Sequence, residues 1–103
     1  MSRIISQKAA SAFYAGRAFR LQNTEVRVYD NGVTELYLHG NKIAQRAPGS
    51  VHGVRFTLAG WNTVTTRERL NALGIHVYTR KGTPYYDGVA ISEYGMYATG
   101  TEE

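Results

Sequence analysis

Alternation of apolar and polar residues is the feature that most constrains the fold of this chain. From residue 24 onward, runs such as TEVRVY (24–29) place an apolar side chain at every second position, the period of a half-buried β-strand. Tight-turn sequences follow these runs, for example DNG (30–32) and GN (40–41), in which asparagine and glycine tolerate positive φ. The pattern therefore predicts consecutive antiparallel strands joined by short hairpins.

The same period defines the other strands. We predict a lead-in strand, a central meander and one later strand over the ranges 18–22, 24–29, 33–39, 42–46, 54–60 and 75–80, with a loop over 47–53. Because the alternation is clean, one face of the sheet is expected to face water.

Two segments depart from this period and predict helices. Residues 4–16 have apolar positions at helical spacing and stop at Gly16. The second helix is expected to begin at a capping box formed by Thr65 and Glu68, and to end at Gly74. This helix is too short to be stable alone, so it must dock on the sheet.

Three apolar side chains are expected to make that docking contact: Leu70, Leu73 and the indole of Trp61, the only tryptophan. The predicted fold class is α+β, an antiparallel meandering β-sheet with two short helices packed on one face. At 103 residues we expect a single domain over 1–103, with residues 98–103 frayed at its end.

Composition excludes several classes of function. The chain has no cysteine, which excludes disulfides, thiolate metal sites and a cysteine nucleophile. It has no apolar run long enough for a signal peptide or a membrane span, so no membrane partner is expected. The net charge is +4, and nine of the twelve basic residues are arginine, which favours an acidic partner such as nucleic acid or an acidic protein surface.

The wet face of the sheet is the first candidate site. Basic and aromatic side chains interleaved in this way are typical of surfaces that bind single-stranded nucleic acid or a protein partner. The alternative is that tyrosine serves as an ordinary strand residue and arginine keeps the face solvated. The outward positions that form this candidate binding surface are Arg27, Tyr29, Tyr37, Arg55, His76, Tyr78 and Arg80.

The start of the second helix is another candidate. Free backbone amides at a helix N-terminus, with arginines nearby, can hold an anion. The alternative is a plain helix cap, in which Glu68 already occupies those amides. The residues of this candidate anion site are Thr65, Thr66, Arg67 and Arg69.

Metal binding and catalysis are not supported by the sequence. His39, His52 and His76 lack the spacing of a helical metal-binding pair, and there is no Gly-x-Ser-x-Gly motif. We expect no metal site, no cofactor and no catalytic residue, hence a protein that is not an enzyme.

Two strings carry a resemblance to known proteins. LYLHGNKIA (36–44) and AGWNTVTTRERLNAL (59–73) resemble segments of a family of short, uncharacterised proteins encoded by tailed bacteriophages. The resemblance implies a phage gene product in the cytoplasm of the bacterial host, with no established activity.

Combined with the arginine and tyrosine content, this favours stoichiometric binding to a host protein or nucleoprotein, with defence systems among the target classes. The alternative is a nucleic-acid-binding accessory protein of low sequence specificity. A homodimer is left open.

Overall fold

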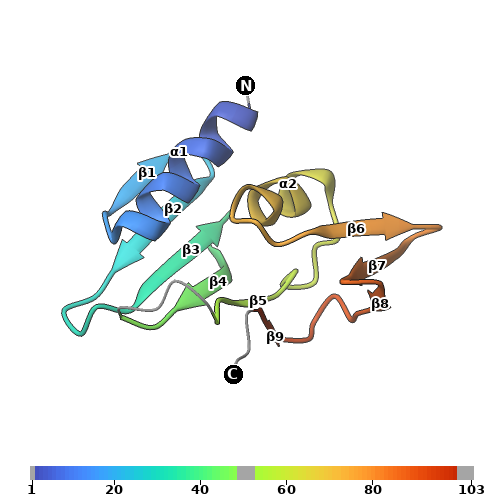
Figure 1. Ribbon diagram of the computed structural model, residues 1–103. Coiled ribbons are helices and arrows are strands. Elements are labelled where there is room, and N and C mark those ends of the chain that lie inside the picture. The colour runs from blue at the N-terminus through green and yellow to red at the C-terminus, as the bar shows by residue number, and fades with distance from the viewer. Residues whose placement is uncertain (1, 49–52, 100–103) are drawn as a thin grey trace.

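The computed structural model describes residues 2–48 and 53–99 of the chain, and the backbone within these ranges forms two helices and nine strands (Figure 1). In chain order they are α1 (Ser2–Ala15), β1 (Phe19–Leu21), β2 (Thr24–Val28), β3 (Thr34–Leu38), β4 (Asn41–Arg46), β5 (Arg55–Phe56), α2 (Val64–Ala72), β6 (Val77–Arg80), β7 (Thr83–Tyr86), β8 (Val89–Ala90) and β9 (Tyr97–Ala98).

The predicted meander forms the main sheet. Strands β1 to β5 lie side by side in chain order, every pair antiparallel, and β9 closes the series beside β5. The register aligns Val26 with Leu36, Leu36 with Ala44 and Ala44 with Phe56, so buried apolar side chains form a row across four strands. The α+β fold class and the antiparallel meander are therefore confirmed.

The prediction of a single sheet is wrong, because the strands form two sheets. Strand β6, predicted at 75–80, does not join the meander but pairs with β7, and β8 completes a separate three-stranded sheet. The physical reason is that β9 occupies the position beside β5. With that edge taken, β6 pairs with the strand that follows it through a short turn.

Both helices pack against the inward side chains of the main sheet. Phe13 of α1 and Leu70 of α2 belong to one buried apolar cluster with Val26 and Leu36. Each helix ends as predicted, at a glycine with positive φ, Gly16 after α1 and Gly74 after α2. After α2 the arrangement is a Schellman motif, in which the Ile75 amide donates to the carbonyl of Leu70 and the Gly74 amide to that of Asn71. After α1 the Arg17 amide donates to the carbonyl of Ala12.

A buried arginine secures the end of α1. Arg46 at the end of β4 donates from Nε to the carbonyl of Phe13 at 3.0 Å and from Nη2 to that of Tyr14 at 2.9 Å. These carbonyls lie in the last turn of α1, where intrahelical partners are lacking. Tyr14 in turn donates its hydroxyl to the carbonyl of Leu73 at 2.6 Å, which ties α1 to the end of α2.

The start of α2 differs from the prediction. The cap is Thr63, whose Oγ1 accepts from the Thr66 amide at 3.2 Å, and the capping box of Thr65 and Glu68 does not form. With Thr63 as the cap, the helix buries the positions i, i+3, i+4 and i+7. These are Thr66, Arg69, Leu70 and Leu73. The helix begins earlier than predicted because the Thr66 hydroxyl also bonds that of Thr63, at 3.0 Å, and Glu68 pairs with Arg69 instead of completing a capping box.

The end of the chain is partly ordered by the main sheet. Of the predicted frayed tail 98–103, Ala98 pairs with Arg55, and the Thr99 amide donates to the carbonyl of Val54 at 2.9 Å. Residues 100–103 lie outside the described ranges, as does His52 in the predicted loop.

Candidate binding site

A cleft of about 510 Å³ opens between the β3–β4 turn and the start of α2. Its floor is apolar and consists of Leu38, Ile43 and Leu58, all buried. Its walls and mouth are formed by His39, Asn41, Trp61, Thr63, Thr65 and Thr66. None of these nine side chains carries a carboxylate, an ammonium or a guanidinium group. The cleft is therefore a neutral concavity with an apolar base and polar walls.

The cleft joins the two strings that carry the phage resemblance. Four lining residues come from 36–44 and four from 59–73, and only Leu58 lies outside both. Neither string shows a catalytic or ligand-binding motif, so their meeting could not be predicted from the sequence. Their proximity follows from the pairing of β3 with β4 and from the docking of α2.

Trp61 lies at this cleft and not in the core. Its side chain is 59% exposed, so the expectation that the indole docks α2 onto the sheet is wrong. Leu70 and Leu73 do make that contact, as predicted. The buried face of α2 is complete without the indole, because Thr66 and Arg69 occupy the positions beside the two leucines.

The β3–β4 turn presents His39 beside the cleft. Both loop residues, His39 and Gly40, have positive φ, 52° and 79°, which is the geometry of a two-residue type I′ hairpin. The turn thus lies one residue earlier than GN (40–41) predicts.

Asn23 contacts that imidazole. The Nδ2 of Asn23 lies 3.4 Å from His39 Nε2. The Asn23 oxygen accepts from Thr24 Oγ1 and Arg69 Nη2, so the Asn23 amide lies between the Arg69 network and His39.

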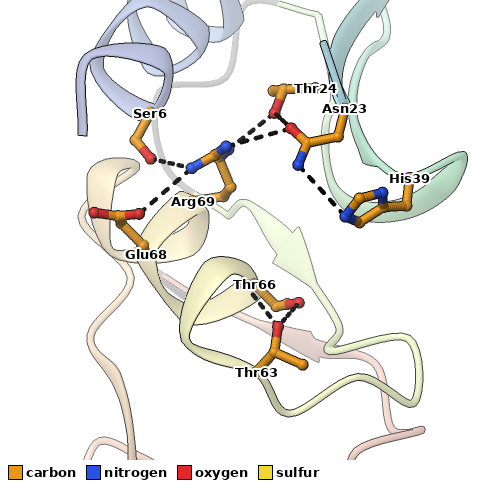
Figure 2. A network of polar contacts seen from close by, with 8 residues as sticks. All are labelled: Ser6, Asn23, Thr24, His39, Thr63, Thr66, Glu68 and Arg69. Carbon is orange, nitrogen blue, oxygen red and sulfur yellow. Dashed lines mark hydrogen bonds and ion pairs between the residues drawn. The ribbon is translucent and has the colours of Figure 1, made fainter. Parts of the chain in front are cut away.

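Arg69 is the centre of the polar network behind the cleft (Figure 2). Its Nε donates to Thr24 Oγ1 at 2.9 Å, its Nη1 to Ser6 Oγ at 2.7 Å and its Nη2 to Asn23 Oδ1 at 3.4 Å. Glu68 forms an ion pair with Nη1 at 3.5 Å. Burial lowers the pKa of Arg69, and the charge of Glu68 opposes that shift. One side chain thereby connects α1, β2 and α2.

This placement removes Arg69 from the predicted anion site. The residue is 2% exposed and lies in the last turn of α2, so it does not reach the amides at the start of the helix. Arg67 is near that start, but its Nη1 donates to both the carbonyl and the side-chain oxygen of Asn62. Arg67 and Glu68 line a separate groove between α1 and α2, whereas Thr65 and Thr66 line the cleft.

Three residues of the predicted binding surface gather around Glu35. The hydroxyls of Tyr29 and Tyr37 donate to Glu35 Oε1 at 3.0 and 2.7 Å, and Lys42 Nζ lies 3.3 Å from Oε2. The guanidinium of Arg27 lies 4.0 Å from the centre of the Tyr37 ring. Burial alone would raise the pKa of Glu35, but these hydrogen bonds outweigh it and lower the pKa.

The same carboxylate raises the pKa of Tyr37, by accepting its hydrogen bond. Arg27 is also paired with Glu25, at 3.2 Å. Charges and hydroxyls on this part of the sheet therefore satisfy one another.

The remaining predicted residues lie elsewhere. Arg55 is on β5, whereas His76 precedes β6 and Tyr78 and Arg80 lie within it, on the second sheet. The seven residues therefore do not share one sheet. Tyr78 instead stacks on Tyr85 of β7, with ring centres 5.5 Å apart.

Two tyrosines cover the end of the main sheet. Tyr86 and Tyr97 pack on Phe56, with ring centres 4.9 and 5.8 Å away. Tyr94 behaves differently, because it is 80% exposed.

Comparison with known proteins places the chain in a family. Residues 2–102 match the family described as Kyanoviridae Gp96 protein. No curated protein and no solved structure matches the chain. Within the described ranges, neither helix is long and apolar enough to cross a membrane. The match extends over nearly all of the sequence and agrees with the phage resemblance of the two strings, and the chain therefore belongs to the Kyanoviridae Gp96 family of bacteriophage proteins.

Proposed function

We propose that this phage protein acts by stoichiometric binding to a host protein or nucleoprotein in the bacterial cytoplasm, and that it catalyses no reaction. The observation that carries the proposal is the exposed Trp61 at the mouth of a preformed cleft. Tryptophan beside a concavity is typical of the residues that dominate protein–protein binding energies. The phage origin favours host machinery as the target, defence systems included.

Two further exposed apolar side chains come from segments next to Trp61, Val64 at the groove between α1 and α2 and Tyr94 beside Gly60. Val64, in the first turn of α2, is 72% exposed, and Tyr94 is 80% exposed. The Tyr94 ring packs against Gly60, the residue before Trp61, so closely that a Cβ on Gly60 would lie 2.7 Å from it. We call Trp61 and Tyr94 the apolar rim. Such a rim is costly to leave in water, which supports a partner that covers it.

Capture of a partner from host lysate tests the proposal. The tagged wild-type protein is compared with Trp61→Ala, and with Tyr29→Ala as a matched control. Tyr29 is also an exposed aromatic residue, but it follows β2 at the far end of the β2–β3 pair from Leu38 and the cleft. We expect one host protein, in near-equal molar amount, that is lost with Trp61→Ala and retained with Tyr29→Ala. If the host protein is lost only with Tyr29→Ala, or is recovered equally with both variants, the rim has no role in binding.

Low-specificity binding of nucleic acid is the second candidate, favoured by the β6–β7 hairpin. The segment 77–86 contains Arg80 and Lys81 and no acidic residue, and its Tyr78 and Tyr85 rings are stacked. Exposed aromatic rings beside basic groups suit single-stranded nucleic acid. The face around Glu35 suits it less, because Glu25 and Glu35 already pair with its cations.

Titration with single- and double-stranded oligonucleotides at two salt concentrations tests this second candidate. Binding that weakens steeply with salt, and that Tyr78→Ala reduces, supports it, because counterion release sets the slope. Absence of binding at low salt removes it.

A further inference from the structure

We propose that the cleft binds an uncharged aromatic side chain on an exposed peptide segment of the partner. This inference rests on the proposed function and specifies what the partner presents. The apolar rim would cover the flanking part of the same segment.

The floor of the cleft favours an apolar ring. Leu38, Ile43 and Leu58 are buried side chains at its base, and the volume of about 510 Å³ lies in the ordinary range of binding pockets for small ligands. That size fits an aromatic side chain together with part of its backbone. The exposed indole of Trp61 at the mouth offers a second aromatic surface, and aromatic pairs gain energy beyond their buried area.

The walls of the cleft suit the neutral donors and acceptors of a peptide. Within the described residues, the side chains of Asn41 and Thr65 make no hydrogen bond. The ring of His39 adds a further polar group at the cleft. These groups can pair with the peptide N–H and C=O on either side of the inserted ring.

The charge distribution disfavours an anionic occupant. No cationic side chain lines the cleft, although the chain as a whole carries a net charge of +4. The two arginines of α2 are engaged elsewhere, Arg67 with Asn62 and Arg69 with Ser6, Thr24 and Asn23. A phosphate or carboxylate in the cleft would lose water without gaining an ion pair.

The cleft also has a rigid frame. Thr63 and Thr66 bond to each other through their hydroxyls at 3.0 Å, and the Arg69 network holds Asn23 against His39 on the opposite wall (Figure 2). A site whose walls are fixed before binding loses little conformational entropy on association.

Short peptides test the inference directly, because Trp61 is the only tryptophan and its fluorescence reports on the mouth of the cleft. The full chain is titrated with N-acetyl-Gly-Phe-Gly-amide, with the alanine and glutamate analogues, and with AMP. Two-dimensional NMR of the backbone amides locates any binding. We expect the phenylalanine peptide to shift Trp61 emission and the amides of 38–43 and 61–66, and to bind at least tenfold more tightly than the other probes.

Variants separate cleft binding from contact elsewhere. Thr65→Phe places a ring in the cleft from a half-exposed helical position and should abolish the NMR shifts, whereas Tyr29→Ala should leave them unchanged. Trp61→Phe keeps an aromatic rim and should retain binding by NMR. Should Thr65→Phe fail to fold, Asn41→Leu is the second cleft variant, with weaker peptide binding expected.

The outcomes distinguish this inference from the proposed function. Equal binding of the alanine peptide, or tighter binding of AMP, overturns the aromatic occupant. If no peptide binds but Trp61→Ala still loses the host protein, the proposed function stands and the occupant is wrong. If the phenylalanine peptide binds in the cleft, but Trp61→Ala and Thr65→Phe both recover the host protein as well as wild type does, the proposed function fails at this site.

Discussion

Arg69 is the residue through which the two helices and the main sheet are held together. A buried guanidinium loses its hydration, and that cost is offset only when its N–H groups find good acceptors. Here the acceptors come from Ser6 on α1, from Thr24 on β2 and from Asn23 just before it. Loss of the guanidinium would leave buried hydroxyls without a donor as well as an empty volume.

Arg69→Ala should therefore lower the free energy of unfolding by about 3–5 kcal/mol, because it empties a buried volume and leaves the hydroxyls of Ser6 and Thr24 without their donor. Equilibrium urea unfolding followed by circular dichroism measures this. The matched control is Arg67→Ala on the same helix, which loses contacts to Asn62 alone and should cost under about 1 kcal/mol. Equal costs for the two variants would mean that the Arg69 network does not stabilise the fold.

Trp61 illustrates the opposite case, a large apolar residue whose removal should hardly affect stability. Because the indole is 59% exposed, Trp61→Ala should change the free energy of unfolding by no more than about 0.5 kcal/mol. A core tryptophan would cost about 3–5 kcal/mol. Urea unfolding distinguishes the two values, and a loss in the larger range would show that the indole is part of the core.

Glu35 gives the stability a defined pH dependence. Its pKa is lowered in the folded state, so its stabilising effect is fully present above the unfolded pKa, about 4.3, and is lost as the pH falls through the lower folded pKa. The stability difference between wild type and Glu35→Gln, measured by urea unfolding, should be largest near neutral pH and shrink toward about pH 3.

Tyr37→Phe is the control for this pH effect. It removes one hydrogen bond to Glu35 while keeping the carboxylate, and so should reduce the pH dependence without abolishing it. A wild-type minus Glu35→Gln difference that stays constant with pH would contradict a role for the carboxylate charge.

At the scale of elements, the start of α2 shows how tertiary packing selects between local signals. Thr63 and Thr65 are both threonines followed at the third position by a residue able to complete a cap. Local chemistry favours Thr65 with Glu68, but Glu68 pairs with the buried Arg69, and Thr63 caps the helix through the amide of Thr66. The burial of Arg69 could not be expected from the sequence pattern, because arginine is usually solvent-exposed.

Thr63→Ala should accordingly cost about 1 kcal/mol as a lost cap, whereas Thr65→Ala should stay within about 0.5 kcal/mol of wild type. Thermal unfolding of the two variants side by side makes the comparison. A larger loss of stability for Thr65→Ala than for Thr63→Ala would show that Thr65, with Glu68, caps the helix.

Several other elements could be predicted because their signals are local, whereas β5 is shorter than the predicted strand 54–60 and β9 overlaps the tail expected to fray. Period-two alternation located β2, β3 and β4, and the glycines at 16 and 74 fixed both helix ends, since a left-handed residue is required there. Which strands share a sheet is a long-range property. The place of β9 beside β5, which excludes β6, follows from chain packing that no window of sequence contains.

At the scale of the whole molecule, the candidate site is a product of the fold. The cleft exists because segments 36–44 and 59–73, distant in the chain, meet across the end of the main sheet. Outward strand positions such as Tyr37 could be predicted from alternation. Their engagement by Glu35 could not, because it depends on the strand register and on side-chain conformation. The exposure of Trp61 could not be predicted either, because tryptophan side chains are largely buried in most proteins.

The central claim is that the partner contacts the apolar rim at the cleft. Photo-crosslinking in phage-infected host cells tests it most directly, with p-benzoylphenylalanine replacing Trp61 in one variant and Tyr29 in another. The account predicts one discrete crosslinked host protein from position 61, reduced by excess wild-type protein but not by Trp61→Ala, and none from position 29. Crosslinking from position 29 with none from position 61 would contradict it.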